Sequence, residues 1–320
     1  MNTSVKGFDL CEGLRIVALI TISVAVETLA QVEHLPATAQ GTSLARVRSG
    51  FITAADGAQI HYLEAGAGLS KRPSTGQRQT EPAILFVPGW MMPAEIWEAQ
   101  LSYFGARRRA IALSPRAQGK SSKPADGHFP AMRARDIKAV VEQLKLAPVA
   151  LIGASMGVTD LAAYVDQFGT ASAAGFVLVH GVPGADYDPA ITPNLLRRAA
   201  EFQTDRRKQT AAMVRSLFQK TPGEAYLNRL TEAALGMPTN SAIASFFGAF
   251  TSDYRPALAK IDKPTLIVTA RNNWLTHYED MHRRINGARM EVLDGVGHAL
   301  FVDDAPRFNA LVDEFLQRLP

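Results

Sequence analysis

The sequence predicts an α/β protein with a mostly parallel, doubly wound sheet and a helical cap insertion. Short continuous apolar runs alternate with segments of helical periodicity, which is typical of parallel strands buried on both faces. One such run is followed at once by Gly153-Ala154-Ser155-Met156-Gly157 and then by a helical pattern. The alternation stops between residues 184 and 260, where only helical stretches occur. We expect this insertion to lie above the strand ends, where α/β sheets bind their ligands.

The elements follow in a regular order. Residues 51–53 and 59–63 flank an Asp56-Gly57 turn and predict a two-strand hairpin. The parallel strands are expected at residues 83–87, 110–113, 149–152, 176–179, 265–268 and 290–293. The helices are expected near residues 93–103, 131–146, 158–168, 278–285 and 305–319. The core therefore comprises residues 50–183 and 261–320, and the cap comprises residues 184–260.

The N-terminal segment has a different character. Lys6 and Arg15 flank an apolar stretch at residues 16–26, and sites rich in small residues follow it. This order is that of a secretory signal. We predict that residues 1–39 are a signal peptide and leader, that the protein is exported to the periplasm or secreted, and that it then has no stable membrane association. Because the apolar run is shorter than the roughly 20 residues that span a bilayer, a permanent anchor is the second interpretation. A misassigned start or an amphipathic tail is the third.

Composition narrows the possible functions. The chain has 320 residues, a formal net charge of +4 and one cysteine, Cys11, which lies before the apolar run. A mature chain would therefore need no disulfides. The densest basic run, residues 107–109, abuts an apolar strand and forms no stripe that would indicate nucleic-acid binding. Paired cysteines, a His-Glu-x-x-His motif and a phosphate-binding glycine loop are all missing, so we expect neither a metal nor a cofactor.

Ser155 is the first candidate for catalysis. A strand, a Gly-x-Ser-x-Gly sequence and a helix in succession are the context of a nucleophile elbow, in which the serine occupies a sharp, strained turn. The flanking glycines let neighbouring backbone pass close to that turn. The sequence therefore predicts that Ser155 is a nucleophile.

A serine hydroxyl needs a base and an oxyanion hole. His298 follows the last expected strand, and Gly297 allows a tight loop that aims its ring at Ser155. The backbone N–H of Met156, the residue after the nucleophile, is the expected first oxyanion donor. The second is the N–H of Trp90, in the loop after the third strand, where Gly89 lets the backbone approach.

Four motifs, in this order, resemble those of the α/β-hydrolase superfamily. They are Phe86-Val87-Pro88-Gly89-Trp90, the segment from Ser114 to Ser121, the segment from Gly153 to Gly157, and Gly297-His298. Together they cover about residues 51–319. The chain is similar to the esterase/perhydrolase-like branch with a helical cap. The resemblance implies the α/β-hydrolase fold and a Ser–His–acid mechanism.

The third catalytic member departs from that family pattern. The superfamily usually has an acid just after the strand matching residues 265–268, and Asn273 occupies this position. Some members keep the acid one strand earlier, where this chain has His180. An Asp-to-Asn change in a serine triad costs about 10⁴ in turnover. We therefore expect either a slow Ser–His dyad assisted by Asn273 or a displaced carboxylate. The displaced candidates are Asp186 and Asp188, and Glu279 and Asp280.

These residues predict a serine hydrolase that cleaves a carboxylic ester or a lactone of a hydrophobic small molecule through an acyl-enzyme at Ser155. The apolar side chains of the insertion favour a hydrophobic substrate of modest size. A perhydrolase or haloperoxidase-like activity and a C–C bond hydrolase remain open on the same fold, because pocket shape decides between them. A non-catalytic ligand-binding relative is the alternative from another class.

Overall fold

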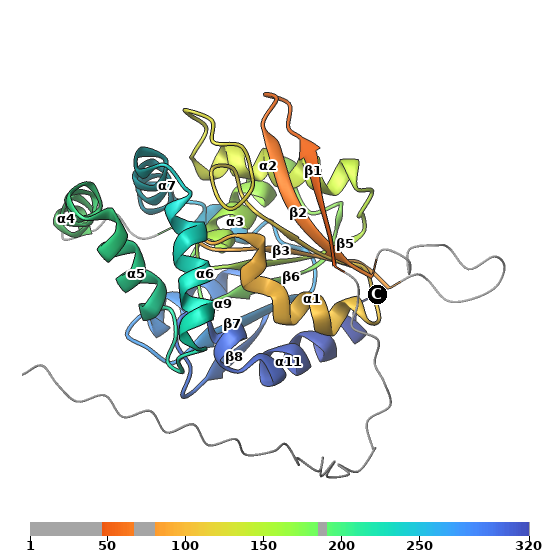
Figure 1. Ribbon diagram of the computed structural model, residues 1–320. Helices are drawn as coiled ribbons and strands as arrows, with labels where there is room; N and C mark the ends of the chain where they lie inside the picture. Colours follow the sequence, from red (N-terminus) through yellow and green to blue (C-terminus); the bar gives the residue numbers. More distant parts are fainter. Residues whose placement is uncertain (1–46, 67–80, 185–190, 320) are drawn as a thin grey trace, which may run out of the picture. The chain divides into compact units, whose positions relative to one another are not determined.

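In the computed structural model, the described residues are 47–66, 81–184 and 191–319. The predicted signal peptide at residues 1–39 and the candidate acids Asp186 and Asp188 lie outside them. Eight strands form a sheet in the order β1-β2-β4-β3-β5-β6-β7-β8 (Figure 1). Their bounds are Arg48–Thr53, Gln59–Ala65, Ala83–Val87, Ala110–Leu113, Val149–Ala154, Ala173–Val179, Thr265–Ala270 and Arg289–Leu293, from β1 to β8.

The sheet is antiparallel at one edge only. β1 and β2 form the predicted hairpin, and β2 also pairs antiparallel with β4. All pairs from β4 to β8 are parallel. The predicted α/β class with a mostly parallel sheet is therefore confirmed, and the carboxyl ends of the parallel strands share one edge.

Side chains alternate along each strand and feed two cores, one on each face. On β3, for example, Ile84 and Phe86 belong to one core, whereas Leu85 and Val87 belong to the other. Helices on both faces explain why these strands are continuous apolar runs.

The helices of the first core are α1 (Glu98–Gly105), α10 (Leu300–Asp303) and α11 (Ala305–Gln317), which pack on one face of the sheet (Figure 1). The helices of the second core are α2 (Pro130–Gln143), α3 (Met156–Phe168), α8 (Arg255–Leu258) and α9 (Leu275–Arg284). The single helix expected near residues 93–103 is two elements, a 3-10 turn η2 (Ala94–Trp97) and then α1. Such turns are common at helix N-termini.

A group of helices follows β6, in the part of the chain expected to form the cap. They are α4 (Ile191–Thr204), α5 (Arg206–Ser216), α6 (Glu224–Leu235) and α7 (Thr239–Thr251), here called the helical insertion. Buried residues of α5, α6 and α7 join the first core. The cap boundaries at residues 184 and 260 stay a prediction. In the described part of the chain, no helix combines the length and apolar character needed to cross a membrane.

Candidate active site

Ser155 occupies a strained turn between β5 and α3. Its backbone has φ 53° and ψ −119°, a conformation that costs about 1–3 kcal/mol for a residue with a side chain. The Ser155 N–H donates to the Val179 carbonyl over 2.9 Å and ties the turn to β6. A Cβ on Gly157 would lie 2.5 Å from the Val87 carbonyl oxygen, so only glycine lets α3 pass this close to β3. The strand, motif and helix thus build the sharp turn that the sequence predicts.

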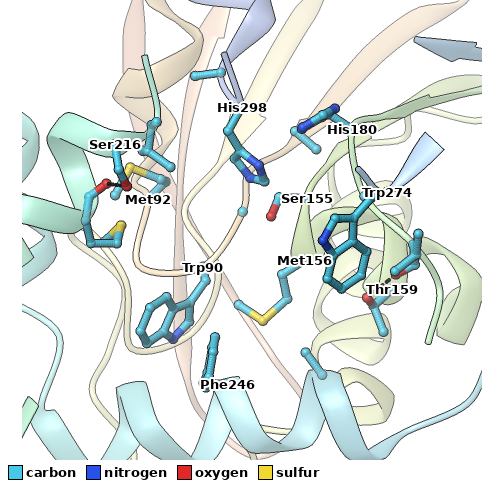
Figure 2. A pocket seen from close by; sticks show the side chains of 18 of the residues that line it. Trp90, Met92, Ser155, Met156, Thr159, His180, Ser216, Phe246, Trp274 and His298 are labelled. Carbon is cyan, nitrogen blue, oxygen red and sulfur yellow. Dashed lines mark hydrogen bonds between the residues drawn. The ribbon is translucent and has the colours of Figure 1, made fainter. Parts of the chain in front are cut away.

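Ser155 faces a cavity of about 430 Å³ between the carboxyl edge of the sheet and the helical insertion (Figure 2). Its size is in the range of small-molecule sites. Most of its wall is apolar and includes Trp90, Met92, Ile96, Met156, Phe246 and Phe250. Two hydroxyl groups of the wall already have hydrogen-bond acceptors, because Thr159 donates to the Val182 carbonyl and Ser216 donates to the Met213 carbonyl.

His298 reaches the same cavity from the loop after β8, and its ring lies beside Ser155 (Figure 2). The Gly297 N–H donates to Asp303 over 2.7 Å, and the Ala299 N–H donates to the Leu217 carbonyl over 2.7 Å, so the loop is held on both sides of the ring. Burial lowers the pKa of His298 to about 4. The ring is therefore neutral near pH 7 and can accept a proton.

Within the described residues, no hydrogen bond joins the His298 ring to the Ser155 hydroxyl. Catalytic hydrogen bonds often tighten only when substrate is bound. The structure places the two predicted residues in one cavity. We expect the hydrogen bond between them to form when substrate binds.

Trp90 and Met156, the predicted oxyanion donors, both line the cavity next to Ser155 (Figure 2). The backbone at Gly89 is close to Ser155, since a Cβ there would lie 2.9 Å from the Ser155 Cβ. Met156 begins α3, so its N–H belongs to the first turn, which has no intrahelical partner. The Trp90 indole N–H is bound elsewhere, to the Ala242 carbonyl at 2.8 Å.

His180 is the residue of this site to which the sequence assigned no role. It directly follows β6, has φ 44°, and lies in the cavity wall with its ring 5.0 Å from that of His298, at 78°. Its Nδ1 accepts the Ala270 N–H over 3.0 Å, so the proton of the neutral ring is on Nε2. Burial and the neighbouring His298 lower the pKa of His180 to about 3. Its one sequence signal was its place at the alternative acid position.

Among the described candidates for the third catalytic residue, Asn273, Glu279 and Asp280 do not line the cavity. Asn273 is exposed, and no hydrogen bond of the described residues joins it to His298. The neighbouring Asn272 lines the cavity instead, with its amide 3.2 Å from the His180 Nε2. Asp280 pairs with Arg284 on α9. The described residues that line the cavity include no Asp or Glu, so within this part of the chain no carboxylate of the cavity wall can orient the His298 ring.

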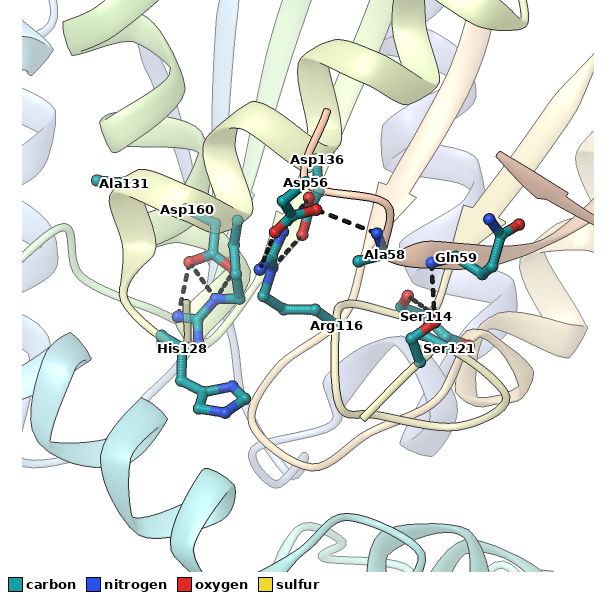
Figure 3. Close-up of polar contacts among 12 residues, drawn as sticks. Asp56, Ala58, Gln59, Ser114, Arg116, Ser121, His128, Ala131, Asp136 and Asp160 are labelled. Carbon is teal, nitrogen blue, oxygen red and sulfur yellow. Dashed lines mark hydrogen bonds and ion pairs between the residues drawn. The ribbon is translucent and has the colours of Figure 1, made fainter. Parts of the chain in front are cut away.

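A buried ionic network fixes α3, the helix that begins directly after Ser155 (Figure 3). Arg133 of α2 donates three hydrogen bonds to Asp160 of α3 at 2.8, 2.9 and 3.0 Å, and both side chains are buried. Arg116, in the second sequence motif, pairs at 2.7 Å with the buried Asp136. The motif after β4 therefore has a structural role, and Asp160 is a structural partner of Arg133 rather than a site residue.

The described residues contain no cluster of three or more His, Cys, Asp or Glu side chains that could hold a metal ion. The arrangement offers a hydroxyl nucleophile, a neutral imidazole and backbone donors around an apolar cavity.

A model of the alpha/beta hydrolase family matches residues 84–311. The chain belongs to this family. The relatives described next are enzymes, and the sheet described above is the α/β-hydrolase fold predicted from the sequence motifs.

Individual relatives are similar at low identity. A non-heme haloperoxidase from Rhodococcus erythropolis is 29% identical over 83% of this chain and 99% of its own length. A bifunctional esterase/perhydrolase from Acinetobacter calcoaceticus is 25% identical over 81% of this chain and 96% of its own. Among solved structures, an esterase from Exiguobacterium antarcticum has a TM-score of 0.75 at 24% identity, covering 83% of this chain and 98% of that one. The resemblance to an esterase/perhydrolase-like protein is confirmed.

Proposed function

We propose that this protein is a serine hydrolase that cleaves a carboxylic ester, or a lactone, of a hydrophobic small molecule. One observation carries the proposal: Ser155, on its strained turn, and the neutral His298 face the same apolar cavity of about 430 Å³. Esterase names among the relatives support the choice of bond.

In the proposed reaction, the Ser155 Oγ attacks the substrate carbonyl carbon while His298 accepts its proton. The backbone N–H groups of Trp90 and Met156 stabilise the oxyanion of the tetrahedral intermediate. His298 returns the proton to the leaving alkoxide, and the alcohol departs from an acyl-enzyme. A water molecule, deprotonated by His298, then releases the carboxylic acid and restores Ser155.

We propose that Ser155 and His298 turn substrate over slowly. Because the described residues of the cavity wall include no carboxylate, the imidazolium that forms on His298 gains no charged partner from this wall. A base with a pKa of about 4 is also a weak proton acceptor at neutral pH. We propose a Ser155–His298 dyad, with Asn273 as an assisting orienter and Asp186 as a displaced acid kept as the alternatives to be tested.

The decisive experiment is labelling with a fluorophosphonate probe, which reacts with activated serines. We expect labelling of the wild-type protein and none of Ser155→Ala. Ser216→Ala is the matched control, because Ser216 also lines the cavity but its hydroxyl already donates to a carbonyl. If the wild-type protein is not labelled although its circular dichroism spectrum shows that it is folded, Ser155 is not an activated nucleophile. This result would favour a non-catalytic ligand-binding relative.

Hydrolysis rates of variants with a panel of p-nitrophenyl esters then identify the residue that orients His298. If Asp186 orients the base, Asp186→Ala loses activity and Asn273→Ala retains it. If Asn273 assists, Asn273→Ala loses activity and Asn273→Asp retains or gains it. If none of these variants changes the rate, neither residue orients His298.

Perhydrolysis is the second candidate function, favoured by the haloperoxidase and perhydrolase names among the relatives. Hydrogen peroxide would replace water in the second step, so that the acyl-enzyme gives a peracid and free Ser155. Measuring peracid and carboxylic acid from one ester in the presence of peroxide gives the partition between the two products.

We further propose that the protein acts outside the cytoplasm, on the strength of the signal-like residues 1–39. N-terminal sequencing of the mature protein tests this, and an uncleaved, cytoplasmic chain would contradict it.

A further inference from the structure

One cation faces the cavity without a counter-charge from the described residues. Arg198, on α4, is the only permanently charged side chain among the described residues that line the cavity. It is partly buried, and its guanidinium carbon lies 6.0 Å from the centre of the Phe246 ring, which is the outer limit of a cation–π contact. Within the described residues it forms no hydrogen bond or ion pair.

This lack of a partner is unusual for its surroundings. Each of the other arginines in the described helical insertion has a carboxylate or carbonyl partner: Arg197, Arg206, Arg207, Arg215 and Arg229. Arg197 is the nearest comparison, since it precedes Arg198 on the same helix, is exposed, and pairs with Glu201 at 2.7 Å.

The position of Arg198 relative to the reacting atoms follows from a chain of contacts. Its guanidinium is over Phe246, and the Phe246 ring lies 4.6 Å from the Trp90 ring. Trp90 adjoins Gly89, which packs on Ser155. An apolar substrate body that lies along Trp90 and Phe246 therefore connects a carbonyl at Ser155 with the guanidinium.

The charge balance of the wall also favours an anion. The two histidines of the wall, with pKa values of about 3 and 4, are neutral near pH 7, and the described wall has no Asp or Glu. Arg198 thus gives this wall a positive charge in apolar surroundings, where an ion pair is screened less than in water. A guanidinium binds a carboxylate well, because its planar fork matches the two oxygens.

We propose that the substrate of this site carries a free carboxylate, which Arg198 binds while the scissile carbonyl lies at Ser155. This inference rests on the proposed hydrolase function and narrows its substrate class to hydrophobic esters or lactones with a separate acidic group. Arg198 is then a specificity-determining residue.

The test compares two esters that differ only in this group: mono-(4-nitrophenyl) suberate, with a free carboxylate, and its methyl ester, without one. The readout is the ratio of kcat/KM for the charged ester to that for the neutral ester. We expect wild type to prefer the charged ester and Arg198→Gln to lower the ratio about 10- to 100-fold, as for loss of a charged hydrogen bond. Arg198→Lys keeps part of the preference, and added salt reduces it in the wild type.

Arg197→Gln is the matched control, because it removes the same charge from the adjacent, solvent-facing position and is expected to keep the wild-type ratio. An unchanged ratio in Arg198→Gln, or an equal fall in Arg197→Gln, would overturn the inference. In both cases hydrolysis of the neutral ester would leave the proposed function standing.

A binding measurement covers the case in which neither ester is hydrolysed. Ser155→Ala is titrated with octanoate and with octanamide, using the fluorescence of Trp90 and Trp274 in the cavity wall. We expect octanoate to bind more tightly, and the added Arg198→Gln change to remove the difference. Equal binding of the two ligands by Ser155→Ala would refute the anion site independently of catalysis.

Discussion

Acidification tests whether His298 is the base, because only its neutral form accepts a proton from Ser155. Burial lowers the pKa of His298 to about 4, whereas a solvated histidine titrates near 6.5. At pH 5, a base with a pKa of 4 is ~90% neutral, and one with a pKa of 6.5 is ~3% neutral. We therefore expect kcat/KM at pH 5 to stay near its plateau, about 30-fold above the value for an ordinary histidine.

The assay is kcat/KM for a neutral p-nitrophenyl ester from pH 3.5 to 8, followed at a wavelength where product absorbance does not depend on pH. Folding must be checked at each pH. The folded-state pKa values of His298 and His180 lie below the unfolded value, so the unfolded chain binds more protons below about pH 6.5. The free energy of unfolding therefore falls as the pH drops from about 6.5 towards 3.

A fall in kcat/KM with a midpoint near pH 6.5, in a protein that is still folded, would refute the reasoning. It would mean that the essential base is solvated or that a carboxylate supports it.

Three further predictions follow from the contacts around the site. Gly89→Ala places a Cβ 2.9 Å from the Ser155 Cβ, so we expect ester hydrolysis to fall at least as much as on loss of one oxyanion donor, about 10²-fold; unaltered hydrolysis would show that this backbone does not shape the site. Arg133→Met leaves Asp160 buried without its partner, and urea unfolding should show a loss of about 3–5 kcal/mol; a loss below about 1 kcal/mol would contradict the structural role of the pair. His180→Asp puts a carboxylate beside the base, which should raise the pKa of that base and increase kcat; an unmoved acid limb in the pH profile would show that the new carboxylate does not reach it.

Much of the fold was predictable because its signals are local. The strand at residues 83–87 has the predicted bounds. It is buried on both faces, so the apolar run in the sequence coincides with the buried strand. The strained turn at Ser155 was predictable for the same reason, because such a turn requires the adjacent glycines; the role of Ser155 as nucleophile stays a prediction. His298 was singled out from its place after the last strand, and the structure puts it in the cavity wall; its role as the base stays a prediction.

The finer features of the site depend on how loops turn and how helices pack, and no local sequence pattern determines either. Asn272, rather than Asn273, lines the cavity because the loop after β7 turns back there, with the Trp274 N–H donating to the Asn272 Oδ1 over 2.9 Å. Arg197 and Arg198 are equivalent in sequence. Their opposite environments follow from how α4 packs in the insertion, which is a tertiary property.

The indole of Trp90 has a consequence for the design of new specificities. Its backbone lies in the loop beside Ser155, whereas its side chain hydrogen-bonds to the Ala242 carbonyl of α7 and packs on Phe246. We therefore expect that moving or replacing α7 displaces the loop that approaches Ser155. We expect an exchange of the helical insertion between relatives to change the catalytic rate together with the substrate range. The loop that contains Trp90 and the helical insertion are therefore best engineered as one unit.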